Sequence, residues 1–286
     1  MSLRSTRDAE FVLLVGSFRF LNRSQIERFI FDGTRVGSRS RQVMTWRTLG
    51  RLKKLGLIAA TPRQIGGSTA GSSGPGYFLT TAGAKLAASL NPGLPVRRPA
   101  VRGTFLMSHG LMTGEVALAF RRAERSHPGH QLIEWESDWQ AAQRLGASHV
   151  VPDARLVYAT TTLKIDAFVE VDLGTEGTRF FAMKVNRYLE LYRSGSWQAH
   201  LRIWPVVVTV TQSKARATAL RCATEALLSS QPDAEHITKG TEFDFCSLED
   251  LLGQSGPLGA IWQVAGRPGL HALLAADDQD LAPSDE

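Results

Sequence analysis

The sequence predicts an α+β protein of two domains, a small helical domain closed by a β-hairpin and a larger α/β domain with a central mixed sheet. The 286 residues suffice for two domains of ordinary size. Helical periodicity dominates the first ninety residues, whereas helices and strands alternate later. A segment with three prolines, residues 91–103, separates the two patterns. We therefore expect domains at 1–95 and 104–274.

Three helices are predicted at the start of the chain. They cover residues 8–20, 22–31 and 38–55. Asn22 or Ser24 supplies an N-cap for the second helix, because a short polar side chain can accept a hydrogen bond from the first turn. Gly56 ends the third helix, since glycine adopts the left-handed conformation that follows many helices.

The third helix is predicted to have one apolar and one basic face. The apolar positions recur at three-residue steps and are Val43, Trp46, Leu49, Leu52 and Leu55. The opposite face carries Arg39, Arg41, Arg47, Arg51 and Lys54. We expect the apolar positions to lie in the core of the domain.

A hairpin and a closing helix follow the third helix. A strand at 57–61, a Gly/Ser-rich loop at 66–76, a strand at 77–80 and a helix at 81–90 are predicted. Three helices followed by such a hairpin is the order of a winged helix-turn-helix domain. In such a domain the third helix enters the DNA major groove.

Charge is distributed unevenly along the chain. Residues 1–100 contain 16 Lys and Arg against 4 Asp and Glu, a net of +12, whereas the remainder has a net of −6. Basic charge gathered in one domain is typical of proteins that bind a polyanion. The sequence therefore predicts double-stranded DNA as the partner of the N-terminal domain.

Candidate DNA contacts lie on the third helix and at the wing. Gln pairs with adenine and Arg with guanine in the major groove, so the first turns are placed to reach base edges. Later basic residues are placed for phosphates. The predicted DNA-binding residues are Arg39, Arg41, Gln42, Thr45, Arg47, Arg51, Lys54 and Arg63.

The second domain is predicted to contain a mixed sheet with helices around it. The predicted helices cover residues 108–125, 177–192 and 213–228, and the predicted strands cover 131–136, 154–160, 164–171 and 203–210. The acidic end of the chain, residues 275–286, is expected to be disordered.

Carboxylates gather around the second and third of these strands. Asp153 directly precedes one strand, and Glu170 and Asp172 lie on the same face of the next, because side chains alternate along a strand. Three converging carboxylates would hold Mg²⁺ or Mn²⁺ and activate water against a phosphodiester. Lys184, with Tyr188 one turn later, lies on the following helix and is placed to reach back to them.

This pattern resembles the PD-(D/E)XK nuclease superfamily, in which a metal-binding Asp precedes a hairpin whose second strand carries an acid and then a Lys. Asp172 stands where that Lys would be. The longer string at 170–192, the N-terminal half and the His109-Gly-Leu segment are similar to the replication-relaxation family of bacterial and plasmid proteins. The similarity covers about residues 8–230.

That family joins a winged helix to a nuclease-like domain and is linked with plasmid replication, mobile elements and DNA relaxation. The resemblance implies catalytic or metal-binding roles for Asp153, Glu170 and Asp172, and a displaced-lysine role for Lys184. Glu115 and Glu136 are weaker candidates for a further carboxylate.

Two functional hypotheses follow. In the first, the winged helix finds a DNA site and the second domain nicks the DNA with Mg²⁺ or Mn²⁺. In the second, the protein is a transcriptional or replication regulator without a cofactor, and its inactive nuclease-like domain serves dimerisation or partner contact. A homodimer would suit a helix-turn-helix that reads two half-sites.

The sequence excludes several other classes of protein, namely zinc-binding, disulfide-stabilised, nucleotide-hydrolysing and membrane-spanning proteins. Cys222 and Cys246 lack the spacing of a zinc site or a disulfide scaffold. Neither a phosphate-binding loop motif nor a long apolar run is present. We expect a cytoplasmic protein that does not enter a membrane.

Overall fold

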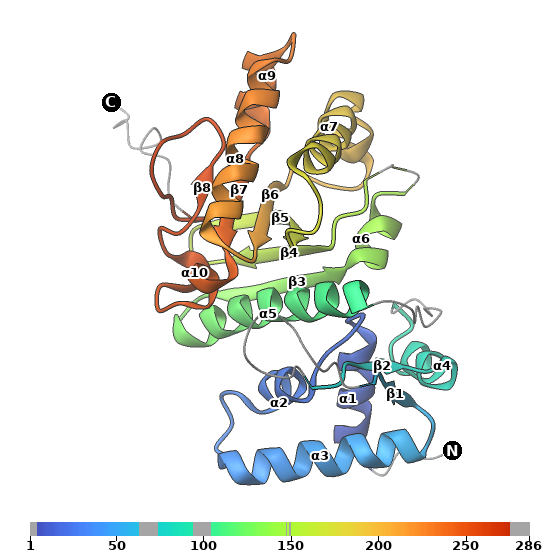
Figure 1. Cartoon of the computed structure of the whole chain (residues 1–286). Coiled ribbons are helices and arrows are strands. Elements are labelled where there is room, and N and C mark those ends of the chain that lie inside the picture. Colours follow the sequence, from blue (N-terminus) through green and yellow to red (C-terminus); the bar gives the residue numbers. More distant parts are fainter. Residues whose placement is uncertain (1–4, 63–73, 94–103, 147, 149, 275–286) are drawn as a thin grey trace, which may run out of the picture. The chain divides into compact units, whose positions relative to one another are not determined.

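The computed structural model describes residues 5–62, 74–93, 104–146, 148 and 150–274 (Figure 1). It is an α+β structure with a mixed sheet. The chain divides into two compact units, residues 1–118 and 119–286. Residues 66–73 of the predicted Gly/Ser-rich loop at 66–76, Arg63 and the acidic tail all lie outside the described residues.

The described part of the first unit contains four helices, a two-stranded sheet and the beginning of a fifth helix. The elements are α1 (Thr6–Gly16), α2 (Arg23–Phe31), α3 (Ser38–Lys54), β1 (Ile58–Ala60), β2 (Tyr77–Leu79), α4 (Thr81–Leu90) and α5 (Thr104–Ser126). The strands β1 and β2 are antiparallel, with Ile58 opposite Leu79. The core is formed by buried apolar side chains of α1 to α4, among them Phe11, Ile26, Leu52 and Ala87.

Local signals set the ends of these helices. Asn22 caps α2 in a capping box with Gln25, in which each side chain accepts a hydrogen bond from the other's backbone N–H at 2.9–3.0 Å. Gly56 follows α3 with a φ of +68°, a conformation that side-chain-bearing residues rarely adopt. The predicted N-cap and helix end are thus present.

The predicted apolar face of α3 is partly wrong. Val43 and Trp46 are exposed, and the buried residues are Thr45, Thr48, Leu49 and Leu52. Each three-residue step turns a helix by about 300°, so the five positions, four steps apart from first to last, drift around the axis instead of staying on one face. Burial instead follows the spacing i, i+3, i+4, i+7 that a helix requires.

The second unit is built on a six-stranded sheet in the order β3-β4-β5-β6-β7-β8. The strands are β3 (Gln131–Ser137), β4 (Ala154–Ala159), β5 (Lys164–Asp172), β6 (Val206–Thr211), β7 (Phe243–Ser247) and β8 (Gln263–Val264). β3, β4 and β5 pair antiparallel, β5, β6 and β7 pair parallel, and β8 is antiparallel to β7. The β4–β5 hairpin places Ala154 opposite Val169.

Helices accompany this sheet. They are α6 (Asp138–Arg144), α7 (Thr178–Ser194), α8 (Lys214–Ser229), α9 (Ala234–Gly240) and α10 (Leu248–Leu252), with short 3₁₀ turns at Ser196–Ala199 and Gly256–Leu258. Side chains of α7 and α8 share a core with Phe168 of β5 and Phe245 of β7. On the opposite sheet face, Phe120 packs against Tyr158, with ring centroids 5.7 Å apart.

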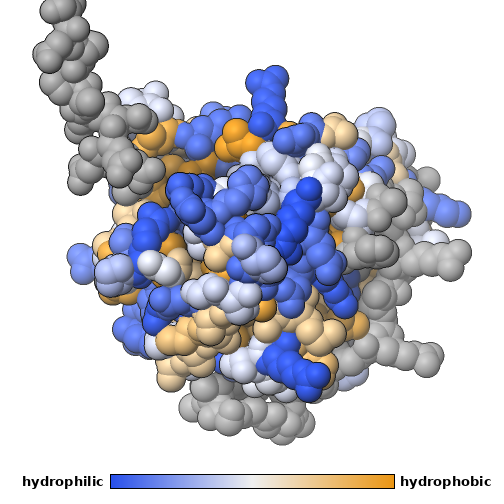
Figure 2. All heavy atoms as spheres, turned by 90° about the horizontal axis from the view of Figure 1, so that it is seen from above, coloured by the Kyte–Doolittle hydropathy of each residue, from blue (hydrophilic) through white to orange (hydrophobic). Residues whose placement is uncertain are grey.

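The surface of the chain mixes hydrophilic and apolar side chains on the side seen from above (Figure 2). Hydrophilic residues predominate there, with smaller apolar areas between them. No helix within the described residues combines the length and apolar character that crossing a membrane requires.

Candidate nucleic-acid interface and carboxylate site

The helix α3 is strongly basic. Its seventeen residues, SRSRQVMTWRTLGRLKK, include six Lys and Arg and no Asp or Glu. Four of the predicted contact residues, Arg39, Gln42, Arg47 and Lys54, are exposed on it. Lys53, which the prediction did not include, is exposed as well. Within the described residues none of the four exposed cations, Arg39, Arg47, Lys53 and Lys54, forms an ion pair, so their charge is available to a partner.

Two of the predicted arginines are engaged inside the first unit. Arg41 donates to the Val36 carbonyl at 2.6 Å and to Asp32 at 3.3 Å. Arg51 donates from Nε to the fully buried Asp8 at 3.1 Å, and this hydrogen bond raises the pKa of Arg51. Both arginines anchor α3 to neighbouring segments, and their charge is largely balanced by these carboxylates.

The expectation for Thr45 is wrong, because its side chain is fully buried against the core of the unit. It faces away from the exposed cations and is unable to reach a base edge. Arg63 lies outside the described residues.

The exposed face of α3 also contains apolar residues that the prediction assigned to the core. Trp46 is 66% exposed and Val43 is 39% exposed. Gly50 lies one turn after Trp46, also exposed, with open space where a Cβ would be. A helical wheel drawn at about 100° per residue would have revealed this face, whereas counting three-residue steps concealed it.

The β4–β5 hairpin brings Asp153 and Glu170 together. Asp153 precedes β4 by one residue, and the register that pairs Ala154 with Val169 places it opposite Glu170. The Asp153 N–H donates to the Val169 carbonyl at 3.0 Å, and the Val171 N–H donates to the Asp153 carboxylate at 2.8 Å. The two acids therefore lie at one end of the hairpin, as predicted.

Glu170 is held between a lysine and a tyrosine of α7. It is 1% exposed. One carboxylate oxygen accepts from Lys184 Nζ and the other from Tyr188 OH, each at 2.5 Å. Burial raises the pKa of Glu170 to about 7; the ammonium of Lys184 opposes this shift and the charge of Asp153 adds to it. The prediction that Lys184 reaches back to the hairpin is correct in geometry.

Asp172 is engaged elsewhere. Its two oxygens accept from Arg216 at 2.8 and 2.9 Å, and one of them also accepts from the Gly174 N–H at 2.8 Å. Arg216 lies in the first turn of α8 and was not among the predicted site residues. Its pairing with Asp172 spans 44 residues, so no local pattern pointed to it.

The residues present do not fit a site of three metal-binding carboxylates. Both oxygens of Glu170 and both oxygens of Asp172 already have partners within the chain. Nowhere in the described part of the chain do three or more His, Cys, Asp or Glu side chains gather as a metal ion would require.

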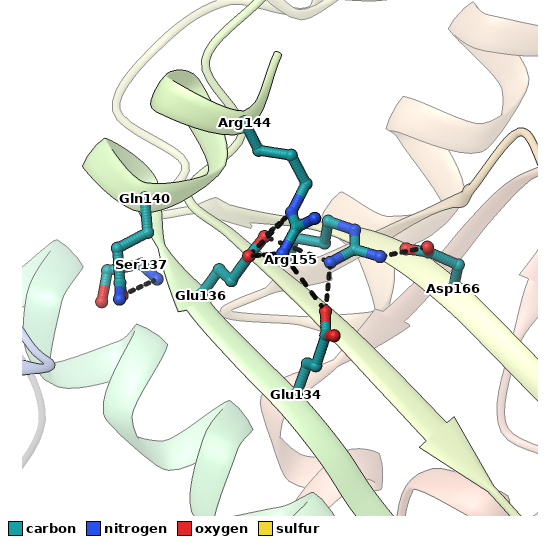
Figure 3. A network of polar contacts seen from close by, with 7 residues as sticks. All are labelled: Glu134, Glu136, Ser137, Gln140, Arg144, Arg155 and Asp166. Carbon is teal, nitrogen blue, oxygen red and sulfur yellow. Dashed lines mark hydrogen bonds and ion pairs between the residues drawn. The ribbon is translucent and has the colours of Figure 1, made fainter. Parts of the chain in front are cut away.

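The two weaker carboxylate candidates belong to other ion pairs. Figure 3 shows Glu136 in a charged network on the β3–β4–β5 side of the sheet. Arg144 and Arg155 both contact Glu136, and Arg155 also pairs with Glu134 and Asp166. In the first unit, Glu115 of α5 pairs with Arg28 and accepts from Gln25 Nε2 at 2.9 Å.

A family model described as replication-relaxation matches residues 13–207. The chain belongs to the replication-relaxation family. No curated protein and no solved structure matches the chain. Membership in the replication-relaxation family points to a role in replication or DNA processing.

The replication-relaxation match covers both regions described above. It includes α3 and also Asp153, Glu170, Asp172 and Lys184. It stops within β6, so Arg216 on α8 lies outside it. The contact that engages Asp172 is thus made by a part of this chain that the replication-relaxation model does not describe.

Proposed function

We propose that this member of the replication-relaxation family binds duplex DNA through α3. The order of three helices, a β-hairpin and a closing helix supports a winged helix-turn-helix for the first unit, in which α3 would enter the major groove. The role in replication or DNA processing to which the replication-relaxation family points is consistent with a DNA partner.

One observation carries the proposal: the exposed face of α3 presents Arg39, Arg47, Lys53 and Lys54 without an acidic residue on the helix. Arginine and lysine at these positions can neutralise phosphates. The two arginines that are balanced by carboxylates, Arg41 and Arg51, lie outside this set and are assigned to holding the helix in place.

We assign the second unit a supporting role without cleavage. The hairpin with Asp153 and Glu170 and the approach of Lys184 support a nuclease-like ancestry. The partners of Glu170 and Asp172 argue against a metal site, so we favour a DNA-binding replication or regulatory protein over a nuclease.

The test is a titration of the full-length protein against a fluorescent duplex at several salt concentrations. Binding should weaken as salt rises, with a log–log slope of about −0.9 for each phosphate contacted. The double variant Arg39→Ala/Arg47→Ala should bind more weakly and reduce the magnitude of that slope by about 1.8.

The matched control is Lys239→Ala/Arg267→Ala, which removes two charges from the second unit. This control should keep the affinity and slope of the wild type. Equal losses in both double variants would attribute binding to net charge and contradict the assignment to α3.

A further inference from the structure

The exposed face of α3 has an apolar centre. With a helical advance of about 100° per residue, Val43, Trp46 and Gly50 fall within an arc of about 60°, and the cation Arg39 lies on the same arc in the first turn of the helix. This arc is opposite the buried Thr45 and Leu52. A large indole thus stands near the middle of the helix with no core to cover it.

Polar and cationic residues border this centre on both sides. At the same helical advance, Gln42 and Lys53 lie on one side of the arc and Arg47 and Lys54 on the other. An apolar stripe between two rows that include cations matches the major groove, where base edges lie between two phosphate backbones. The only apolar group that the four bases display in the major groove is the thymine methyl group.

The same charges disfavour a second copy of this chain as the occupant. In a two-fold symmetric dimer through this face, α3 would meet α3. Cations would then face cations on a helix that contains no acid. Like charges brought together at an interface oppose association.

We propose that Trp46 and Val43 read thymine methyl groups in the major groove, so that the protein prefers sites with thymine at positions facing the middle of α3. The inference rests on the proposed binding of duplex DNA and adds to it the base feature that is recognised. Gly50, with open space at its missing Cβ, would let the helix backbone approach the groove closely.

The experiment starts from duplexes selected by the full-length protein from a randomised library. A selected duplex is then synthesised with deoxyuridine in place of thymidine, which removes only the methyl groups. For the wild type this change should weaken binding about fourfold for each methyl group that is contacted.

Trp46→Ala should bind the thymidine duplex more weakly than the wild type and lose most of the difference between thymidine and deoxyuridine. Such non-additivity is expected when the two removed groups touch each other. The control is Phe180→Ala, which removes an aromatic side chain of the second unit that is 60% exposed. It should retain the wild-type affinity and the full deoxyuridine effect.

Three results would overturn the inference while leaving DNA binding intact: selected sites without thymine, equal affinity of the wild type for both duplexes, or an unchanged deoxyuridine effect in Trp46→Ala. If Trp46→Ala also converts a dimer into a monomer in sedimentation, the face is a protein interface. Absence of binding to every duplex in dilute buffer would instead reject the proposed function itself.

Discussion

Arg51 of α3 is bound to Asp8 of α1, whose carboxylate is fully buried. The pair joins residues 43 positions apart and attaches the basic helix to the first helix of the unit. Arg51, which the sequence predicts as a DNA contact, therefore holds two helices of the first unit together. The distinction between anchoring and exposed arginines on α3 can be measured.

Arg51→Ala should destabilise the protein, because it leaves the Asp8 carboxylate buried without its arginine partner. We expect a loss on the order of 3 kcal/mol in the free energy of unfolding, measured by denaturant titration. Arg47→Ala, an exposed position one turn earlier, should change stability by no more than about 0.5 kcal/mol. A similar small effect at both positions would show that Asp8 does not depend on Arg51.

Gly50→Ala should affect stability and DNA binding in opposite directions. Alanine favours the interior of a helix over glycine by about 1 kcal/mol, and nothing within 4 Å opposes the added Cβ. The same methyl group would project into the space that DNA occupies in our proposal. Thermal unfolding and duplex titration of the same preparation test both expectations. Affinity equal to that of the wild type would indicate that DNA does not approach the helix at Gly50.

Arg155→Ala should be among the more damaging substitutions in the second unit. Arg155 is 5% exposed and pairs with Glu134, Glu136 and Asp166 (Figure 3). Loss of the cation would leave the buried Asp166 carboxylate without its arginine partner, and the free energy of unfolding should fall by about 3–5 kcal/mol. Arg144→Ala, at the more exposed side of the same network, is the control and should cost clearly less. Equal costs would contradict a central role for Arg155.

Stability should depend on pH through Glu170. Burial raises its pKa to about 7, from an ordinary value of 4.5. Between these values the folded protein retains a proton that the unfolded chain has released. The free energy of unfolding contributed by this group should therefore fall as pH rises, by at most about 1.4 kcal/mol per pH unit.

Glu170→Gln removes this titration. The free energy of unfolding of this variant, measured by denaturation between pH 4.5 and 7, should therefore depend less on pH than that of the wild type. Glu190→Gln, an exposed position on α7, serves as the control and should retain the wild-type slope. An unchanged slope in Glu170→Gln would show that this carboxyl group does not titrate in the window.

We expect no metal-dependent nicking of supercoiled plasmid by the wild type in Mg²⁺ or Mn²⁺, because Glu170 and Asp172 are already paired with Lys184 and Arg216. Asp153→Ala should give the same result. Open circles formed by the wild type and not by Asp153→Ala would contradict this expectation. They would mean that Glu170 exchanges its partners when DNA is bound.

Local signals made much of the fold predictable. The cap at Asn22, the glycine after α3 and the β4–β5 hairpin each depend on residues close together in the chain. The reach of Lys184 to Glu170 was also predictable, since a helix that follows a strand directly brings its early turns near the end of that strand.

Pairings between distant segments were not predictable. The pairs Asp8–Arg51 and Asp172–Arg216 leave no trace in periodicity, because their partners are 43 and 44 positions apart, and the sequence assigned Arg51 to DNA and Asp172 to a metal ion instead. β7 and β8 were missed because they are short, and the buried β7 shows no alternation between apolar and polar positions. The exposure of Trp46 was hidden by the assumption that a tryptophan within an apolar series belongs to the core.

The helix α5 determines where the chain can be cut. Its residues Leu111 and Glu115 accept hydrogen bonds from Gln25, and Gly114 leaves room for Leu21. A truncation at the proline-containing segment before α5 would remove these partners and expose the apolar side of α2 and its neighbours to water. Fragments intended to test DNA binding by the first unit alone should therefore extend to Leu118; shorter ones would aggregate or unfold for reasons unrelated to DNA.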